Sequence, residues 1–295
     1  MEVAVKRISH FLAAMLLLLI GAPIAADFCP GTGAEYRSST NYLIADTLGQ
    51  FLVGESMAPD DSYSCGRVEH GFWHSDIHVP TLSELKGENN YTWVDAYGKI
   101  VTAGSDQLSG AFYVQEANRI SGIRVYLHGN PAQVLAGDMV DVSGQIVTSA
   151  TSGERYIDYP IMTVRFAGVP VPKPLAMINR SLGGQDLNDL THGITAGKGP
   201  YNVGLLLTTW GMVTSKDTAS PSRFFYVDDG TALSEGVGLQ GVYVYTSSLA
   251  SGNSITPPEV GHYAIVTGIC TMARLPDGRI VARLRPRTQA DIVEY

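Results

Sequence analysis

The sequence predicts an all-β protein made of two tandem barrels preceded by a small β-rich module. Three observations lead to this prediction. Charged residues make up only 16% of the chain, whereas glycine and proline together number 47, a composition typical of a fold with many turns. Short apolar runs alternate with polar residues, which indicates strands rather than helices. Several blocks near the middle of the chain also recur, in the same order, closer to its end.

The first 26 residues predict a secretory signal peptide. Lys6 and Arg7 precede an apolar run from Phe11 to Ile20, and Ala26 suits the position before a cleavage site. This run is shorter than the roughly 18 apolar residues of a spanning helix, and no later segment reaches that length. We therefore expect a secreted protein, extracellular or periplasmic, without a membrane span. Removal of residues 1–26 leaves 18 Lys and Arg against 27 Asp and Glu, a net charge of −9.

Residues 27–79 are expected to form the small β-rich N-terminal module. The stretch YRSSTNYLIADTLGQFLVGESM, followed later by GFWHSD, resembles an N-terminal segment of many exported bacterial proteins. That resemblance implies no particular chemistry. In an oxidising compartment Cys29 and Cys65 are expected to close a disulfide. Three free thiols are the alternative, because spacing alone does not fix connectivity.

The internal repeat is the strongest structural signal. Each copy predicts one strand, then a hairpin of two alternating strands, then a loop and a further strand that ends near a glycine. The matched blocks are GKIVTAG at 98–104 with WGMVTSK at 210–216, residues 111–127 with 224–246, and GDMVDVSGQIV at 137–147 with GHYAIVTGICT at 261–271.

The repeat sets the expected domain boundaries. The first barrel is expected over 80–169 and the second over 209–295. A connection over 170–208 is rich in proline and glycine, which predicts a semi-rigid linker followed by irregular chain. The segment PTLSELKGENN at 80–90 predicts one helical turn that leads into the first barrel.

The repeated blocks resemble the oligonucleotide/oligosaccharide-binding (OB) fold as it occurs in exported bacterial proteins. The first copy carries GKIVTAG, FYVQEANRISGIRVYL and GDMVDVSGQI, and the second carries TTWGMVT, FFYVDDGTAL, GVYVYTSSL and VGHYAIVTGI. The resemblance implies two five-stranded Greek-key barrels. It specifies architecture rather than function, since this fold hosts many unrelated ligands.

Three histidines four residues apart, in HGFWHSDIH at 70–78, raise the question of a metal site. Gly71, the aromatic pair beside it and the β-branched residues before Pro80 argue against a helix. In a strand, histidines at this spacing lie about 13 Å apart at ~3.3 Å per residue, too far to share zinc. A turn at Ser75 and Asp76 is the arrangement that would bring them together. We expect solvated histidines and no metal.

Other short motifs do not fit a known ligand loop. GITAGKG at 193–199 lacks the spacing and the final Ser or Thr of a phosphate-binding loop. The acidic clusters DLND at 186–189 and VDDG at 227–230 do not reach calcium-loop spacing. The second is expected to begin a hairpin turn, because Asp-Gly is a turn sequence.

No arrangement of residues supports catalysis, so we expect a protein that is not an enzyme and needs no cofactor. The sequence has no Gly-x-Ser-x-Gly elbow, and no nucleophile with a recognisable partner base. The repeat aligns Cys270 with Ile146, an apolar strand position. We therefore expect Cys270 to be a buried structural thiol.

Strand alternation singles out a candidate binding face. Because strand side chains alternate between faces, Phe112, Val114, Ile123 and Val125 are expected inside the first barrel, and their equivalents inside the second. The residues expected outside form the candidate ligand-binding set, namely Tyr113, Arg124, Tyr126, Tyr226, Tyr243 and Tyr245. This is the surface on which OB folds hold their ligands. Alternatively, the tyrosines form cross-strand pairs or pack against the neighbouring module.

An extended ligand, either an oligosaccharide or a single-stranded nucleic acid, is the expected partner. Exposed rings stack on bases and on sugar faces alike. The acidic chain is unfavourable for nucleic acid, and GRIVARLRPRT at 278–288 is its only basic run. Its arginines, Arg279, Arg283, Arg285 and Arg287, line one edge or form a solvated strand face. The alternative function is structural or adhesive, with the barrels packing on each other or on a cell-surface protein.

Overall fold

The structure is a computed structural model that divides the chain into two units, Met1–Ile77 and His78–Tyr295. In the first unit it describes a two-stranded antiparallel pair, β1 (Asp27–Phe28) with β2 (Tyr36–Arg37). In the second it describes residues 80–129, 133–219, 223–231, 233–236 and 238–295. The expected signal peptide, the Cys29–Cys65 disulfide and the three histidines at 70–78 lie outside the described residues.

The second unit begins with the expected helical turn, α2 (Leu82–Leu85). Thr81 caps it: the Thr81 hydroxyl accepts the Glu84 N–H, and the Glu84 carboxylate accepts the Thr81 N–H at 2.7 Å. Leu82 and Leu85 are buried and belong to the core of the first barrel. This cap lets a very short helix close one side of that barrel.

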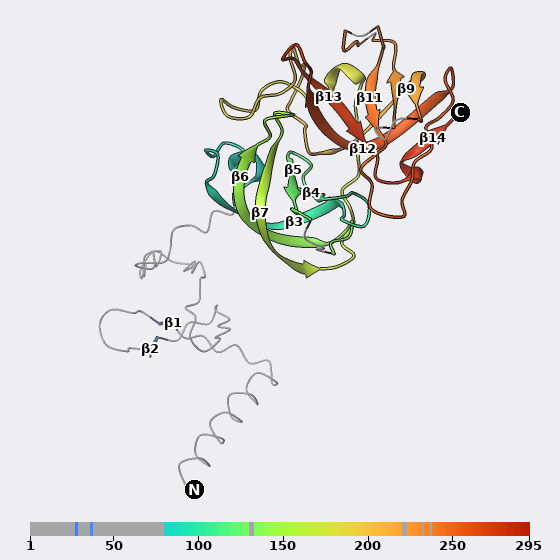
Figure 1. Ribbon diagram of the computed structural model, residues 1–295. Helices are drawn as coiled ribbons and strands as arrows, with labels where there is room; N and C mark the ends of the chain where they lie inside the picture. Colours follow the sequence, from blue (N-terminus) through green and yellow to red (C-terminus); the bar gives the residue numbers. More distant parts are fainter. Residues whose placement is uncertain are drawn as a thin grey trace. The chain divides into compact units, whose positions relative to one another are not determined.

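The first barrel is a closed ring of five strands (Figure 1). Its strands are β3 (Trp93–Ala103), β4 (Ala111–Gln115), β5 (Gly122–Tyr126), β6 (Met139–Thr148) and β7 (Arg155–Phe166). The order around the ring is β3-β4-β5-β7-β6, and only the β5–β7 pair is parallel.

The second barrel repeats this topology. Its strands are β9 (Leu206–Asp217), β10 (Phe224–Asp228), β11 (Val242–Tyr245), β12 (Tyr263–Arg274) and β13 (Ile280–Arg285). The pairing of β12 with β9 closes the ring, and again only one ring pair, β11–β13, is parallel. Two short strands extend the sheet, β8 (Leu175–Ala176) beside β9 and β14 (Ile292–Glu294) beside β12.

The interiors follow the alternation that the sequence predicts. Phe112, Val114, Ile123 and Val125 lie in the core of the first barrel. Their equivalents in the second-barrel core are Phe225, Val227, Val242 and Val244. The all-β prediction with two OB-like five-stranded barrels is therefore confirmed.

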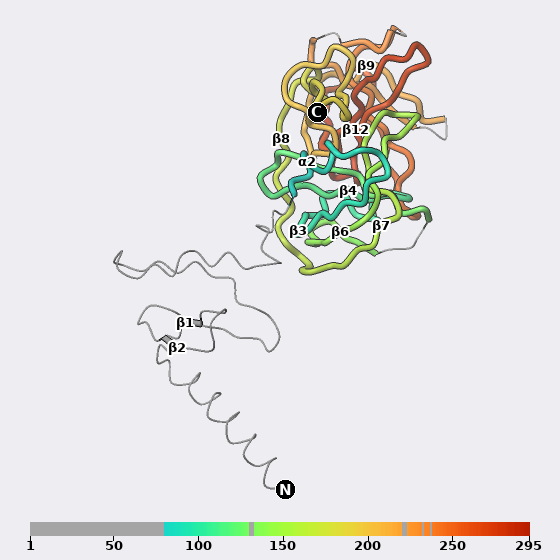
Figure 2. Tube along the Cα trace, turned by 90° about the vertical axis from the view of Figure 1, so that its left-hand side faces the viewer, coloured from blue at the N-terminus to red at the C-terminus, as the bar shows by residue number. Residues whose placement is uncertain are grey.

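The two barrels lie against each other (Figure 2), and their contact includes Ala103, Leu108 and Tyr113 of the first and Leu206 and Ile269 of the second. The connection between them contains β8 and the short 3-10 turn η1 (Asn179–Ser181), and a second such turn, η2 (Gln289–Asp291), precedes β14. Gly122 and Gly204 allow the closest approach, since a Cβ on Gly122 would stand 2.2 Å from the Gly204 carbonyl oxygen. The Leu206 N–H donates to Gln115 Oε1 at 3.0 Å across the same junction.

Candidate ligand-binding face

The most exposed ring surface near the predicted site lies on the first barrel, on β5 and β7. The Arg124 guanidinium lies 4.7 Å from the Tyr156 ring centroid and 5.7 Å from that of Tyr126. The two tyrosine rings meet edge to face at 6.0 Å. Arg124 and Tyr126 are thus brought together as the sequence predicts, and Tyr126 remains 36% exposed.

Two further rings extend this surface, that of His128 just after β5 and that of Tyr159 within β7. The His128 ring lies 4.5 Å from the Tyr126 ring and 4.5 Å from the Tyr159 ring, to which it is almost parallel. His128 and Tyr159 have positive φ angles of 49° and 48°, in the left-handed region that non-glycine residues seldom adopt. Tyr159 is 62% exposed. We call Arg124, Tyr126, His128, Tyr156 and Tyr159 the first-barrel aromatic cluster.

The charges of this cluster are compensated locally. Arg124 Nη1 lies 3.4 Å from the Glu154 carboxylate, and His128 pairs with Asp158. Glu154 and Asp158 are both buried. The cluster therefore presents flat rings and polar edges without a net positive field.

Tyr113 points out of the first barrel but is not exposed, which corrects the expectation that it lies on an open face. It is 1% exposed and packs with Leu206 and Ile269 of the second barrel. Its hydroxyl donates to Glu154 Oε1 at 3.1 Å, and burial raises the pKa of the Tyr113 phenol. The β4 part of the expected ligand face is thus a contact between the two barrels, as the packing alternative predicts.

In the second barrel the predicted tyrosines form an aromatic ladder with Phe224. Tyr226 and Tyr243 are direct cross-strand partners whose rings meet edge to face at 5.3 Å. The Phe224, Tyr243 and Tyr245 rings follow one another at 4.7 Å and 6.3 Å with interplanar angles of 26° and 27°. This arrangement is the cross-strand pairing that the sequence left open.

Most of the ladder is covered, so the expected exposure of Tyr226 and Tyr243 is wrong. Tyr226 is 3% exposed and Tyr243 7% exposed. The Arg283 guanidinium lies 4.0 Å from the Tyr243 ring centroid and 3.7 Å from the Glu235 carboxylate. The Tyr226 hydroxyl donates to the same carboxylate at 3.3 Å, and burial raises the pKa of Glu235.

Of the arginines in the basic run, Arg283 and Arg285 lie on β13 over rings of the ladder, and Arg279 and Arg287 flank that strand. Arg285 lies 5.9 Å from the Tyr245 ring centroid and donates to the Ser248 carbonyl oxygen at 2.6 Å. Arg279 donates to the Glu235 carbonyl oxygen at 2.7 Å, and Arg287 forms an ion pair with Asp291 at 2.7 Å. The basic run is therefore largely engaged within the chain rather than arranged as an open edge.

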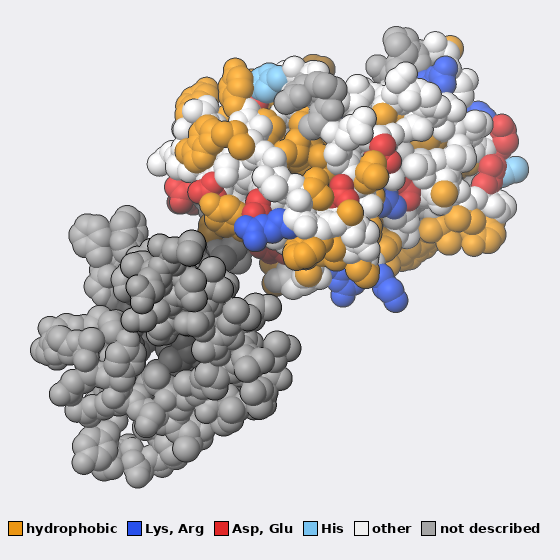
Figure 3. Space-filling model, turned by 90° about the horizontal axis from the view of Figure 1, so that it is seen from below, with side chains coloured by type: hydrophobic (Ala, Val, Ile, Leu, Met, Phe, Trp, Pro, Cys, Tyr) orange, Lys and Arg blue, Asp and Glu red, His pale blue; other side chains and the backbone are white. Residues whose placement is uncertain are grey.

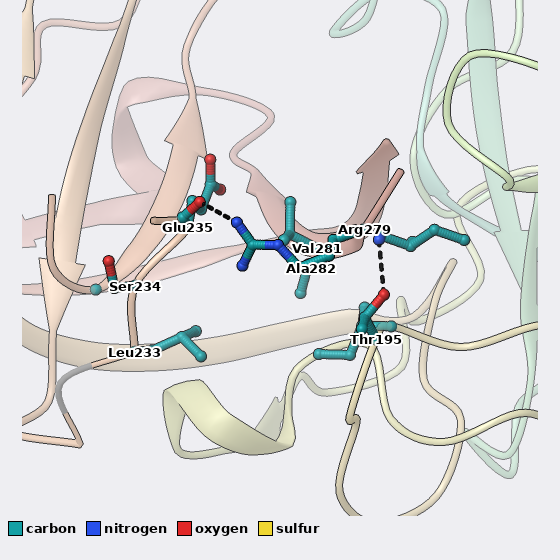
Figure 4. A pocket seen from close by; sticks show the side chains of 10 residues that line it. Thr195, Leu233, Ser234, Glu235, Arg279, Val281 and Ala282 are labelled. Atoms are coloured by element: carbon teal, nitrogen blue, oxygen red, sulfur yellow. Dashed lines mark hydrogen bonds between the residues drawn. The ribbon is translucent and has the colours of Figure 1, made fainter. Parts of the chain in front are cut away.

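A small hollow lies between Arg279, Glu235 and Thr195 (Figure 4). Its volume is about 80 Å³, enough for a few water molecules. Pockets for small organic ligands measure about 300–1,000 Å³. This hollow is therefore not a candidate for such a ligand.

The remaining motifs have ordinary structural roles. In 186–189, Asp186 accepts the Gly193 N–H at 2.8 Å. In 227–230, Asp229 accepts the Asn179 and Thr231 N–H groups. The described residues contain no group of three or more His, Cys, Asp or Glu side chains placed to hold a metal ion. Cys270 is fully buried in the second-barrel core, and burial raises the pKa of its thiol to about 12.

Sequence reasoning missed three of the five cluster residues. Tyr156 faces outward from β7 by the same alternation and could have been found by extending the pattern to that strand. His128 and Tyr159 have left-handed backbone angles, which interrupt the alternation of a strand. Strand alternation therefore does not predict the direction of their side chains. Phe224 of the ladder was also not predicted, although it directly precedes Phe225, a predicted interior residue.

Comparisons with known proteins leave the chain without an assigned family. No family model matches it, and no curated protein matches it. Solved structures with limited similarity include a murine DNA-binding protein bound with double-stranded DNA, at 10% identity and a TM-score of 0.34, covering 69% of this chain and 96% of that one. Fission yeast Pot1 with single-stranded DNA matches at 12% identity and a TM-score of 0.32, covering 75% and 90%. The Ifi202 HINa domain in complex with a 20-bp double-stranded DNA matches at 10% identity and a TM-score of 0.30, covering 70% and 96%.

These TM-scores are too low to carry an argument about the ligand of this chain. Within the described residues, no helix is both long and apolar enough to cross a membrane.

Proposed function

We propose that this is a non-catalytic binding protein that holds an extended glycan on the first-barrel aromatic cluster. The observation that carries the proposal is the exposed row of rings formed by Tyr126, His128 and Tyr159, at spacings of 4.5 Å. These rings remain accessible while the rings of the second-barrel ladder are mostly covered.

The chemistry of the cluster suits a sugar. The apolar face of a pyranose ring stacks on a flat aromatic side chain, which presents apolar area together with a polar tip. The hydroxyl groups of Tyr126 and Tyr159 supply donors and acceptors at the edges of the row. Such a platform needs no deep pocket, and an extended chain of sugars fits it better than one small molecule.

The charge distribution favours a glycan over a nucleic acid. Residues 80–295 carry 16 Lys and Arg against 19 Asp and Glu, a net charge of −3. Within the cluster, Arg124 is paired with Glu154 and His128 with Asp158. Binding to phosphates draws its affinity from cations that release counterions, and the one arginine of the cluster is already paired with a carboxylate. The export that residues 1–26 predict is consistent with a glycan ligand outside the cell.

The experiment is a glycan-array screen of the full chain, followed by titration of the strongest ligand. The Tyr159→Ala variant removes an exposed ring at the end of the row. The matched control is Tyr97→Ala, which removes a 41% exposed tyrosine from β3 of the same barrel, outside the cluster. A fluorescent single-stranded oligothymidylate is titrated in parallel, since the Arg283 and Arg285 face is the best alternative for nucleic acid.

We expect Tyr159→Ala to raise the Kd for the glycan roughly tenfold, a loss of about 1.4 kcal/mol, while Tyr97→Ala leaves it unchanged. Both variants should keep the circular dichroism of the parent protein. Equal loss in the two variants, or no glycan bound on the array, would overturn the proposal. Oligothymidylate binding that resists Tyr159→Ala would instead assign the ligand to the nucleic-acid class.

A further inference from the structure

The second barrel carries a broad exposed apolar face on three neighbouring strands. Its side chains are 36–73% exposed. They are Trp210 and Met212 of β9, Tyr263 and Ile265 of β12, and Val293 and Tyr295 on and just after β14. We call this surface the β9–β12–β14 face. In Figure 3, hydrophobic side chains are grouped at the right-hand end beside acidic and histidine side chains.

The strand register makes this face continuous. Ile265 lies opposite Trp210 on one side and opposite Val293 on the other. Tyr263 lies opposite Met212, and its carbonyl oxygen accepts the Tyr295 N–H at 2.8 Å. The six side chains therefore form two adjacent rows of three across the sheet, all on the side that faces away from the barrel core.

The first barrel shows that the fold does not require this surface. By the repeat, Trp210 corresponds to Gly98, Tyr263 to Met139 and Ile265 to Asp141. Asp141 forms an ion pair with Arg165 and accepts the Gly98 N–H. At the positions of Trp210 and Ile265 the first barrel thus carries a glycine and a charged residue, although it exposes other large apolar side chains on β3 and β7, among them Trp93 and Phe166. The continuous apolar rows across β9, β12 and β14 are therefore not a requirement of the shared fold.

The size and composition of the face fit a protein interface. At these exposed fractions the face presents roughly 600 Å² of apolar surface, because one aromatic side chain carries about 150–250 Å². This is at the upper end of the patches that monomers expose, and a standard interface buries about 800 Å² on each partner. Trp, Tyr and Met are enriched at such interfaces. A sugar platform would need more polar groups between its rings than Ile265, Met212 and Val293 supply.

The rim of the face limits the charge of its partner. Lys216 lies 2.7 Å from Glu259, and His262 lies 2.7 Å from Glu294, all four at the border of the face. A partner of opposite charge would require a rim of one sign. Because these groups are paired within one chain, the rim presents no excess of either sign, and a second copy can approach it across a two-fold axis without repulsion.

We propose that the β9–β12–β14 face pairs with the same face of a second copy of the chain, forming a two-fold dimer. This dimer does not depend on the proposed glycan, because no residue of the first-barrel aromatic cluster lies on the face. Its interface has an apolar centre of six side chains from each copy and, at its rim, ion pairs closed within each copy.

The test is sedimentation velocity of the full chain over a range of micromolar concentrations, without ligand. The wild type should sediment at twice the mass of one chain. The double variant Tyr263→Lys/Ile265→Lys should be monomeric, because it buries like charges across the two-fold axis. The control is Ile161→Lys/Phe166→Lys, which places the same charges on β7 at sites that are 66% and 63% exposed, and it should remain dimeric.

A single substitution, Trp210→Lys, separates dissociation from misfolding, and its circular dichroism should match that of the wild type while its mass falls. A wild type that stays monomeric at every concentration overturns the proposal. So does a dimer that survives the Tyr263→Lys/Ile265→Lys change. Loss of the dimer in both double variants would show a general effect of charge and would equally overturn it.

Discussion

The two barrels share a ring order, a single parallel pair and equivalent core positions, yet their outer surfaces differ almost everywhere. The first presents an exposed row of rings and, between β6 and β7, the ion pair of Asp141 with Arg165. The second covers its tyrosine ladder with Arg283 and Glu235 and exposes an apolar face. Strand alternation therefore determines the interior, whereas the side chains on the outside of a barrel can differ between two copies of one fold.

The similarity of the two cores can be tested by one substitution at an equivalent position in each barrel. Phe112 and Phe225 are both fully buried, each on the second strand of its ring. Each Phe→Ala substitution should lower the free energy of unfolding by about 3–5 kcal/mol, because it leaves a large cavity. Urea unfolding followed by circular dichroism measures both. If one substitution lowered the free energy of unfolding several times more than the other, the two cores would not be equivalent.

The junction between the barrels contains a buried lysine, which has no counterpart among the core residues described for either barrel. Lys86 is 1% exposed, and its ammonium donates to the Val203 carbonyl oxygen at 3.1 Å and lies 4.7 Å from the Tyr201 ring centroid. Burial lowers the pKa of Lys86 to about 7, against the attraction of Glu154 and Glu116.

This depressed pKa predicts a pH-dependent stability. Between pH 7 and the ordinary lysine pKa of 10.5, the unfolded chain holds a proton that the folded chain has lost. Stability should therefore rise with pH above 7, with a slope approaching about 1.4 kcal/mol per pH unit. Urea midpoints from pH 7 to 8 measure it, below the ordinary thiol pKa of 9.0 at which Cys270 titrates in the unfolded chain. Lys86→Met should flatten the rise, and a rise that persists in this variant would assign it to other groups.

The two covered tyrosine faces can be compared through matched hydroxyl deletions. Tyr113 donates to Glu154 at 3.1 Å, and Tyr226 donates to Glu235 at 3.3 Å, each to a buried carboxylate. Tyr→Phe at either position should cost about 1–3 kcal/mol, because a buried acceptor loses its partner. The same urea assay gives both values. An unchanged free energy of unfolding for Tyr113→Phe would mean that water reaches the junction between the barrels. The sites of Tyr113 and Tyr226 would then not be equivalent.

The smallest expected effect is that of salt on glycan binding. The paired charges of the first-barrel aromatic cluster leave no cation to release counterions, so the Kd should change less than about twofold between 50 and 200 mM salt. A nucleic-acid ligand held by several arginines would lose affinity by orders of magnitude over the same range. Titration at the two salt concentrations distinguishes these cases.

The sequence predicts the interior well and the surface poorly, for one physical reason. Alternation states on which side of a strand a residue lies, and it assigns Phe112 and Val242 to the cores and Tyr113 and Tyr243 to the outside. It does not state what covers the outside. Tyr113 is buried by Leu206 and Ile269 of the other barrel, and Tyr226 by a contact with Glu235 in a loop.

The cluster was only partly predictable for a related reason. Arg124 and Tyr126 follow the strand period, but His128 and Tyr159 lie where the backbone turns through positive φ. Glu154, which compensates Arg124, comes from a loop 30 residues away in sequence. Such partners are set by the tertiary fold and have no local sequence signature.

The most direct test of the central claim is fluorine NMR of the full chain labelled with 3-fluorotyrosine, titrated with the glycan selected on the array. Single Tyr→Phe variants assign the resonances. The account predicts ligand-induced shifts at Tyr126, Tyr156 and Tyr159, with the Tyr243 and Tyr245 resonances unmoved. Shifts confined to the second-barrel ladder would contradict it and would transfer the binding face to the other barrel.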